Sequence, residues 1–455
     1  MIGALKAVAG DGEAALFWSA AILLVAALLL GGASRGAPLR WLVVELSGLG
    51  AGCIALVQGA GKKPTPLAWA AVVLLGLLFA IPIAQLTPLP PPVWTALAGR
   101  GPLAHAISLI GLPQGWRPMS LAPDETARAG LYLIAPAGMF LAAFQLSGRR
   151  RGHLVAILVG VALVSLIVGA VQAAGGDAGR FRLYDAAVPG LPNGFFANRN
   201  HQAALMVACV LFAAAAFRRE GRAGAGVQPA ARLGLMLLFA VGAAATLSRA
   251  GVLLLAPALL GGLLMLRPAS WRPGALAPVI AVCAAVIAVV ILVAILKGGV
   301  ILDRFMATTD EGGGRLDLLP PILRLGQGLQ PWGGGLGAFD LLYRASEPLE
   351  QIDPFYLNHV HDDYVEAWLE GGWPAVVLML GFGAWWSVAA WSCWSAPPAP
   401  GSALARAGSL TSLLLLLHSG VDYPLRTPAL AVVFALACAL MLDPPRPRSA
   451  ETSEP

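Results

Sequence analysis

Charged residues are scarce in this chain. Asp, Glu, Lys and Arg together account for only 12% of its 455 residues, whereas a soluble domain of ordinary composition is about 25% charged. Hydrophobic residues make up 58%, and the mean hydropathy is +0.75. These values exclude an ordinary soluble globular protein and indicate a chain that lies mostly within lipid.

Cysteine is also sparse. The chain has five cysteines, and all of them lie inside apolar runs rather than in the long polar loop. Neither a disulfide framework nor a thiolate metal site is indicated by that distribution. The five are Cys53, Cys209, Cys283, Cys393 and Cys438.

Apolar runs of about 18 to 22 residues recur along the chain, each long enough to cross a bilayer of roughly 30 Å as a helix. The runs do not alternate polar and apolar residues, which argues against a barrel. The sequence therefore predicts an all-α polytopic transmembrane bundle of about 12 spans. The expected spans are 15–32, 41–58, 66–87, 129–147, 154–174, 201–217, 233–248, 250–266, 275–296, 373–394, 404–420 and 427–442.

The expected domain organisation follows from these spans. Residues 1–442 are predicted to form one integral membrane domain, and residues 297–372, between spans 9 and 10, form a loop subdomain. Residues 443–455 are predicted to be a short disordered tail. The first run is expected to be a retained span rather than a cleaved signal, because many spans follow it.

Short-loop Lys and Arg residues predict the orientation of the bundle. With twelve spans, five positive clusters fall on one side, which is therefore expected to be cytoplasmic together with both termini. The opposite side carries the unusual polar sequence. Arg35 and Arg40, in the first loop on that opposite side, are the exception. The five clusters are Lys62-Lys63, Arg149 to Arg151, the group around Arg218, Arg267 with Arg272, and Arg446 with Arg448.

The segment 193–201 lies at the outer end of the sixth span. Arg199 can bind phosphate or carboxylate oxygens through a planar fork of donors. Asn198 and Asn200 beside it suit the cap of a helix. The alternative is an arginine that anchors a helix end at the lipid headgroups, although an anchor does not need three nearby asparagines and a histidine.

The segment 246–251 is a tight break between two spans on the same side. It is either a turn with an anchoring arginine or a second anion site. Arg249 and Arg199 at one depth would repel each other unless they face water or an anionic group lies between them. A diphosphate suits that place.

The long loop contributes two further pieces. Arg315 begins a short amphipathic piece, and the stretch 330–339 is rich in glycine and aromatic residues. These glycines are expected to let backbone pass close to helices rather than to bind phosphate. The aromatic residues of the long loop could stack on sugars or form an ordinary interfacial belt.

The loop closes on His359-Val360-His361-Asp362-Asp363. His361 is expected in the first turn of a helix that runs through Glu370, where a neutral imidazole can accept a proton from a hydroxyl. A metal site is less favoured, because His361 and Asp362 would point apart on a helix. A solvated loop histidine is the remaining alternative. Three residues on the same side are expected to support the site from behind: His418, Asp422 and Arg426.

Taken in order, these pieces resemble the O-antigen ligase family of membrane glycosyltransferases, which also includes related polysaccharide polymerases. The resemblance covers roughly residues 120–440. Asp362 departs from the family pattern, in which asparagine commonly follows the histidine. The matching text is residues 194–201, residues 247–251, Arg315 with the 331–339 turn, residues 361–364 through Glu370-Gly371-Gly372, and residues 418–428.

The resemblance implies transfer of a glycan from undecaprenyl diphosphate to a saccharide or lipid A core acceptor. It implies no nucleotide sugar, metal or other cofactor, and no nucleic-acid partner is expected. The expected location is the bacterial inner membrane, with the site on its periplasmic face. By motif, His361 would be the catalytic base. The substrate-binding set would be Arg199 and Arg249 on the diphosphate, with Arg315, Asn198, Asn200 and Asp362.

A direct displacement of this kind predicts inversion at the anomeric carbon. The sequence does not distinguish ligation from polymerisation or protein O-glycosylation. The alternative of another class is a lipid-linked saccharide transporter or flippase. Transporters usually carry ionisable groups near the membrane midplane, whereas Glu45 is the main candidate of that kind in the expected spans.

Overall fold

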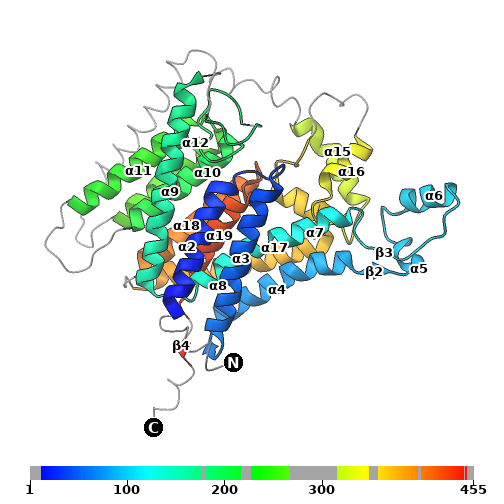
Figure 1. Ribbon diagram of the computed structural model, residues 1–455, viewed down its shortest axis with the longest axis horizontal. Coiled ribbons are helices and arrows are strands. Elements are labelled where there is room, and N and C mark those ends of the chain that lie inside the picture. Colours follow the sequence, from blue (N-terminus) through cyan, green and yellow to red (C-terminus); the bar gives the residue numbers. More distant parts are fainter. Residues whose placement is uncertain are drawn as a thin grey trace, which may run out of the picture.

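The computed structural model describes residues 12–176, 181–185, 187–216, 227–266, 315–347, 357–397, 401–444 and 446–447, and is mostly helical there. Figure 1 shows the helices packed as a bundle with α2, α18 and α19 near its middle. The helices are α2 (Gly12–Leu30), α3 (Pro38–Gly59), α4 (Pro66–Leu86), α5 (Pro91–Trp94), α6 (Gly101–Leu109), α7 (Pro123–Tyr132), α8 (Ile134–Ala143), α9 (Gly148–Ala174), α10 (Arg199–Ala215), α11 (Val227–Ala245), α12 (Arg249–Leu266), α15 (Arg315–Gln327), α16 (Phe339–Ser346), α17 (Asp363–Ser395), α18 (Ser402–Ser419), the 3₁₀ helix η4 (Pro424–Arg426) and α19 (Pro428–Leu440).

Seven helical segments in the described part of the chain are long and apolar enough to cross a membrane: α2, α3, α4, α7 with α8, α9, α12 and α17. The predicted spans over α10, α11, α18 and α19 also fall on helices, which are shorter or less apolar. The predicted span 275–296 lies outside the described residues. A multi-pass helical protein is supported, while the count of 12 spans and the limits of the loop remain predictions.

Helix α10 is buried on all sides. Every residue from His201 to Ala215 is buried, and a helix that is buried on all sides must be enclosed by other helices. Its neighbours are α9, α11, α12 and α18. Since α10 begins at Arg199, the first of the predicted anion-binding arginines lies where this buried helix starts.

Helix α2 defines the two ends of the bundle. At its start, Glu13 accepts a hydrogen bond from Ser147 N at 2.8 Å, beside Arg149 to Arg151. A second basic cluster lies at β1 (Lys62–Lys63), which pairs antiparallel with β4 (Arg446–Pro447), and Lys62 reaches Gln145 near this end. Past the other end of α2, Gly32 O accepts from Ala197 N at 3.0 Å. The Arg199 motif and these two basic clusters are thus at opposite ends of the described bundle.

The two arginines that break the charge rule both have partners. Arg35 forms an ion pair with Asp340 of α16, and Asp340 also binds Arg344. Arg40 stacks on the ring of Tyr184 at 4.7 Å and donates to Leu183 O. These partners explain how two cations are accommodated at the end of the bundle opposite the clusters at 62–63 and 149–151.

Part of the predicted loop subdomain forms its own small core. Ile322, Leu329, Phe339, Tyr343 and Leu369 are buried together, from α15 and the turn after it, α16 and the first part of α17. The tight turn 331–337 lies against α17 where that helix breaks. Gly334 N and Gly335 N donate to Leu369 O and Glu370 O at 3.0 and 2.9 Å, which satisfies carbonyl groups that the broken helix leaves without helical partners.

Gly372 forms the break in α17. Its φ is 63° and its ψ is −157°, a region that is essentially restricted to glycine. A Cβ at this position would lie against Pro331 O and 2.6 Å from the carbonyl carbon of Trp332. This geometry agrees with the expectation that the loop glycines permit close backbone approach.

Gly372→Ala is expected to destabilise the protein by about 1–3 kcal/mol or more, because the new Cβ clashes and the backbone angle is unfavourable. The thermal unfolding midpoint of the purified protein in detergent measures this effect. Gly383→Ala is the matched control in the same helix, where nothing lies within 4 Å of an added Cβ. A fall in the midpoint as large for Gly383→Ala as for Gly372→Ala would contradict the interpretation.

Candidate functional site

His361 lies just before α17 rather than inside it. The prediction that it stands in the first turn of this helix is wrong, because α17 begins at Asp363 and Asp362 is its N-cap. The Asp362 side chain accepts hydrogen bonds from Tyr364 N and Val365 N at 2.9 and 3.1 Å. Aspartate is among the best N-cap residues, so this contact accounts for the side chain of Asp362 without a substrate.

The backbone of His361 is strained. Its φ is +59°, the left-handed region that costs a residue with a side chain about 1–2 kcal/mol. Leu247 also has a φ of +59°, and these two are the non-glycine residues with positive φ in the described part of the chain. Such strain gathers at functional sites, and both residues lie in the predicted motifs.

His361 and Asp422 form a hydrogen-bonded pair. His361 Nδ1 lies 3.0 Å from Asp422 Oδ1. The Asp422 side chain is only 1% exposed, whereas that of His361 is 18% exposed. A buried carboxylate that binds Nδ1 selects the tautomer whose basic nitrogen is Nε2. The pair therefore has the form of a general base with an orienting acid.

The acid of this pair stays ionised. Burial by itself would raise the pKa of Asp422, but the hydrogen bond to His361 and the imidazoles of His201, His361 and His418 lower it well below its usual range. The carboxylate is therefore charged at any physiological pH, and it can stabilise the imidazolium that forms when His361 takes up a proton.

Four of the six histidines surround Tyr423 and Asp422. The rings of His201, His359 and His361 lie 5.0, 4.4 and 4.8 Å from the Tyr423 ring. His418 Nε2 lies 3.9 Å from Asp422 Oδ2. The Tyr423 hydroxyl is hydrogen-bonded to Asn198 and Asn358, and burial raises the pKa of Tyr423 to about 12. Tyr423 thus connects Asn198, the cap of α10, to the segment 358–361 that carries His359 and His361.

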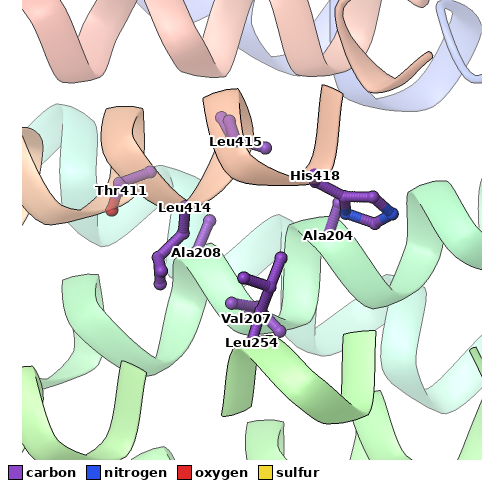
Figure 2. Close-up of a pocket in the computed structure, with 8 residues that line it drawn as sticks. All are labelled: Ala204, Val207, Ala208, Leu254, Thr411, Leu414, Leu415 and His418. Atoms are coloured by element: carbon purple, nitrogen blue, oxygen red, sulfur yellow. The ribbon is translucent and has the colours of Figure 1, made fainter. Parts of the chain in front are cut away.

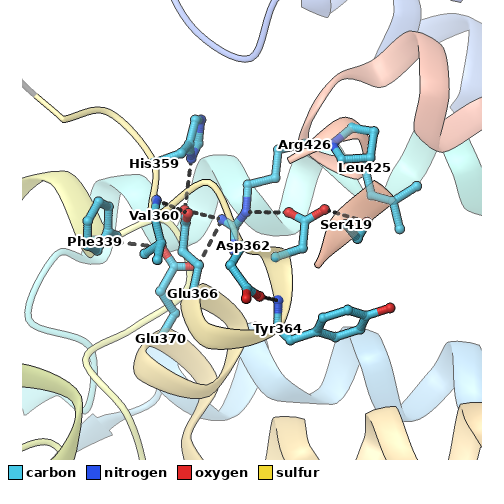
Figure 3. Close-up of polar contacts among 12 residues, drawn as sticks. Phe339, His359, Val360, Asp362, Tyr364, Glu366, Glu370, Ser419, Leu425 and Arg426 are labelled. Atoms are coloured by element: carbon cyan, nitrogen blue, oxygen red, sulfur yellow. Dashed lines mark hydrogen bonds and ion pairs between the residues drawn. The ribbon is translucent and has the colours of Figure 1, made fainter. Parts of the chain in front are cut away.

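A network of buried charges between Arg426 and α17 supports the segment 359–361 (Figure 3). Arg426 binds Asp363, Glu366 and Glu370 of α17 at 3.3, 2.9 and 3.0 Å. Glu366 in turn binds His359 Nδ1 and Val360 N, both at 2.8 Å. Because the carboxylate of Glu366 binds both His359 and Val360, the backbone that leads into His361 is held in place.

Asn198 and Asn200 have the predicted place at the start of α10. The Asn198 side chain caps the helix by accepting from Asn200 N at 2.8 Å, and it also contacts Tyr423. Arg199 is the first residue of the helix. A helix N-terminus and a guanidinium together favour an anion, and this one is adjacent to the histidine cluster through Tyr423.

Arg249 begins α12 at the same end of the bundle. Ser248 precedes it, and its hydroxyl accepts from Gly251 N at 3.2 Å as a cap. Gly251 packs so closely on Ala203 of α10 that an added Cβ would meet that side chain. Helices α10 and α12 therefore start side by side, and Arg249 itself is exposed. The two predicted diphosphate ligands begin neighbouring helices.

An apolar pocket lies beneath the histidine cluster, between α10, α12 and α18 (Figure 2). Ala204 and Ala208 line it on α10, Leu254 on α12, and Leu414 with His418 on α18. His418 stands at its edge in Figure 2. The site is thus bordered on this side by apolar side chains rather than by further charge.

Two further predictions concern Arg315 and the metal alternative at His359 and His361. Arg315 is the first residue of α15, but its side chain lies outside what the structure describes. His359 and His361 bind different carboxylates, Glu366 and Asp422. Among the described residues, no group of three or more His, Cys, Asp and Glu side chains could hold a metal ion. The His-x-His metal alternative therefore gains no support.

Residues 234–380 match the O-antigen ligase family. The resemblance predicted from the motifs is confirmed over these residues, which run from within α11 to the second part of α17. The O-antigen ligase match includes Arg249, Arg315 and His361, and ends before Asp422. With the apolar helices, it indicates a multi-pass membrane protein of surface-polysaccharide synthesis with a glycosyltransferase-like activity. No curated protein matches the chain.

Three residues of the site were not identified in the sequence as members of it. His201 and Tyr423 were noted only as parts of longer motifs, and His359 only as a metal ligand. The signal that could have found them is the distribution of histidine: six in the whole chain, of which four fall in the motif segments.

Proposed function

We propose that this protein transfers a glycan from undecaprenyl diphosphate to a hydroxyl of a saccharide acceptor, at the periplasmic face of the bacterial inner membrane. The observation that carries the proposal is the pair formed by partly exposed His361 and buried Asp422, near the N-termini of α10 and α12. An orienting carboxylate, an accessible imidazole and two arginines suit the deprotonation of a hydroxyl next to an anionic leaving group.

In the first part of the reaction, the acceptor hydroxyl loses its proton to His361 Nε2. Asp422 holds Nδ1–H and stabilises the imidazolium. The acceptor oxygen forms a bond to the anomeric carbon from the face opposite the diphosphate. One displacement of this geometry inverts the configuration at that carbon.

In the same step, the bond between the anomeric carbon and the diphosphate oxygen breaks, and its electron pair stays on the diphosphate. Arg199 and Arg249 stabilise that growing charge, assisted by the amide groups at the starts of their helices. Such preorganised electrostatic stabilisation is commonly the largest contribution to catalysis. Charge is balanced, because the proton remains on His361 until it is released to water.

The deciding experiment is transfer by the purified, detergent-solubilised protein from a defined undecaprenyl-diphosphate glycan to candidate acceptors. We expect glycosidic product with inverted anomeric configuration, measured by NMR, and undiminished rates in the presence of a chelator. Retention of configuration would contradict the single displacement. Passage of the lipid-linked glycan across reconstituted vesicles without any transfer would instead support the transporter alternative.

Arg199→Lys and Arg249→Lys are each expected to slow transfer by roughly 10-fold or more, because lysine keeps the charge but loses the planar fork that binds two phosphate oxygens. Initial rates at saturating acceptor measure the effect. Arg40→Lys is the control at the same end of the bundle, since Arg40 stacks on Tyr184 instead. Wild-type rates in both Arg199→Lys and Arg249→Lys would exclude the diphosphate role.

A further inference from the structure

A lateral arm, residues 88–118, projects from the side of the bundle beyond α4 (Figure 1). It begins directly after α4 and contains α5 and α6. The short strands β2 (Pro88–Leu89) and β3 (Arg117–Pro118) pair antiparallel and close its base. None of the functional motifs lies in this arm, so its role is separate from the chemistry proposed above.

The arm is firmly attached to the loop subdomain. Arg100 is almost completely buried, and its guanidinium donates to Ala98 O at 2.6 Å, to Met119 O, and to Gly333 O at 2.9 Å. Trp94 is also buried and donates from Nε1 to Gly115 O at 2.9 Å. These contacts fix the arm at the end of the bundle where the site lies, because Gly333 belongs to the turn against α17.

The outer part of the arm is apolar and uncovered. Leu109, Ile110 and Trp116 are 72%, 70% and 68% exposed. On α6 and its C-cap, Leu103, Ile107 and Ile110 recur at the spacing of one helical face; Ile107 is buried against the rest of the arm, whereas Leu103 and Ile110 are exposed. On the other side of α6, Ser108 and Gln114 bond each other and the Ala104 carbonyl. The arm is therefore amphipathic, with a persistent apolar surface.

Several features identify a lipid surface as the occupant. The arm continues α4, whose Val73, Leu77 and Ile83 are exposed apolar residues of a candidate span. Residues 88–118 contain no Asp or Glu, so nothing in them repels anionic headgroups. Tryptophan is favoured at the membrane interface, and exposed apolar side chains next to polar groups can insert at the boundary between headgroups and acyl chains.

We propose that the lateral arm lies in the boundary between headgroups and acyl chains of the leaflet next to the site. Leu109, Ile110 and Trp116 enter the lipid, and Ser108 faces the headgroups. Through the bond between Arg100 and Gly333, the arm holds the loop subdomain at a fixed height above the bilayer. A lipid-linked substrate that diffuses in this leaflet then meets the site at a constant depth.

The test uses the full-length protein without its native cysteines, in vesicles of phosphatidylethanolamine and phosphatidylglycerol. Nitroxide labels are placed at Ile110→Cys, at Leu77→Cys as the lipid-exposed control, and at Ala345→Cys on α16 as the aqueous control. We expect oxygen to collide with the label at residue 110 far more often than a water-soluble nickel chelate does, as at residue 77. Behaviour like that of residue 345 overturns the proposal.

Two further outcomes bear on the same surface. A label at residue 110 that is shielded from both agents, or coupled to a second label, means that protein covers the arm, and this overturns the proposal too. Trp116→Phe tests the arm without labels or cysteine replacement. We expect brominated lipids to quench less fluorescence in this variant than in the unmodified protein, and an unchanged quenched fraction counts against lipid contact.

Discussion

His361→Ala is expected to lower the rate of glycan transfer by about 10²- to 10⁴-fold while the protein still inserts and folds. The imidazole supplies the proton acceptor, and it contributes little to the packing of the bundle: it is partly exposed, with Asp422 as its hydrogen-bond partner and the Tyr423 ring beside it. Transfer from a saturating concentration of donor, with protein level and elution profile held equal, measures the effect. Full activity in the well-expressed variant would refute the base assignment.

Two further variants test the same assignment. His361→Gly relieves the positive φ of +59° while it also removes the imidazole, so it is expected to be at least as stable as the parent and equally inactive. Added imidazole should partly restore transfer in His361→Gly, because the space it vacates adjoins Asp422. His153→Ala, at a histidine near the start of α9 and beside Phe17 of α2, is the control and should transfer normally.

Asp422→Asn is expected to reduce transfer by about 10³-fold or more, because an amide can hold imidazole in the wrong tautomer and cannot stabilise its charged form. The substitution keeps the size of the side chain, so the cluster around Tyr423 should remain packed. The transfer rate of Asp422→Asn divided by that of the unmodified protein, both at saturating donor and acceptor, measures the effect.

Asp363→Asn is the matched control for Asp422→Asn. Asp363 bonds Ser419 and Arg426 but not His361, so its loss should lower the melting temperature more than the rate. Equal losses of rate in the two variants would mean that Asp422 acts only through the fold. A near-normal rate in Asp422→Asn would remove the orienting role altogether.

The helical architecture could be predicted from sequence because lipid permits few solutions. A run such as 154–174 has to form a helix to satisfy its own backbone, and α9 covers it. The start of α17 was harder to predict. Asp362 and Asp363 are both good capping residues, and only the contacts of Asp362 with Tyr364 and Val365 decide between them.

The site was only partly predictable. Arg199, Arg249 and His361 were found because each lies in a dense polar segment between apolar runs. The bond between His361 and Asp422 joins residues 61 positions apart, and no local pattern encodes such a pairing. His201 was hidden for another reason: it lies in the first turn of an apolar helix, where a histidine usually indicates only the membrane boundary.

The ion pair between Arg35 and Asp340 has a consequence for biogenesis. In the predicted orientation, Arg35 crosses the membrane with the first hairpin against the usual retention of cations on the inner side, yet its carboxylate partner is 305 residues further along the chain. Its guanidinium then has no Asp340 to pair with until α16 has been synthesised. In that orientation the N-terminal hairpin reaches its final contacts only after the segment that carries α16 has been delivered.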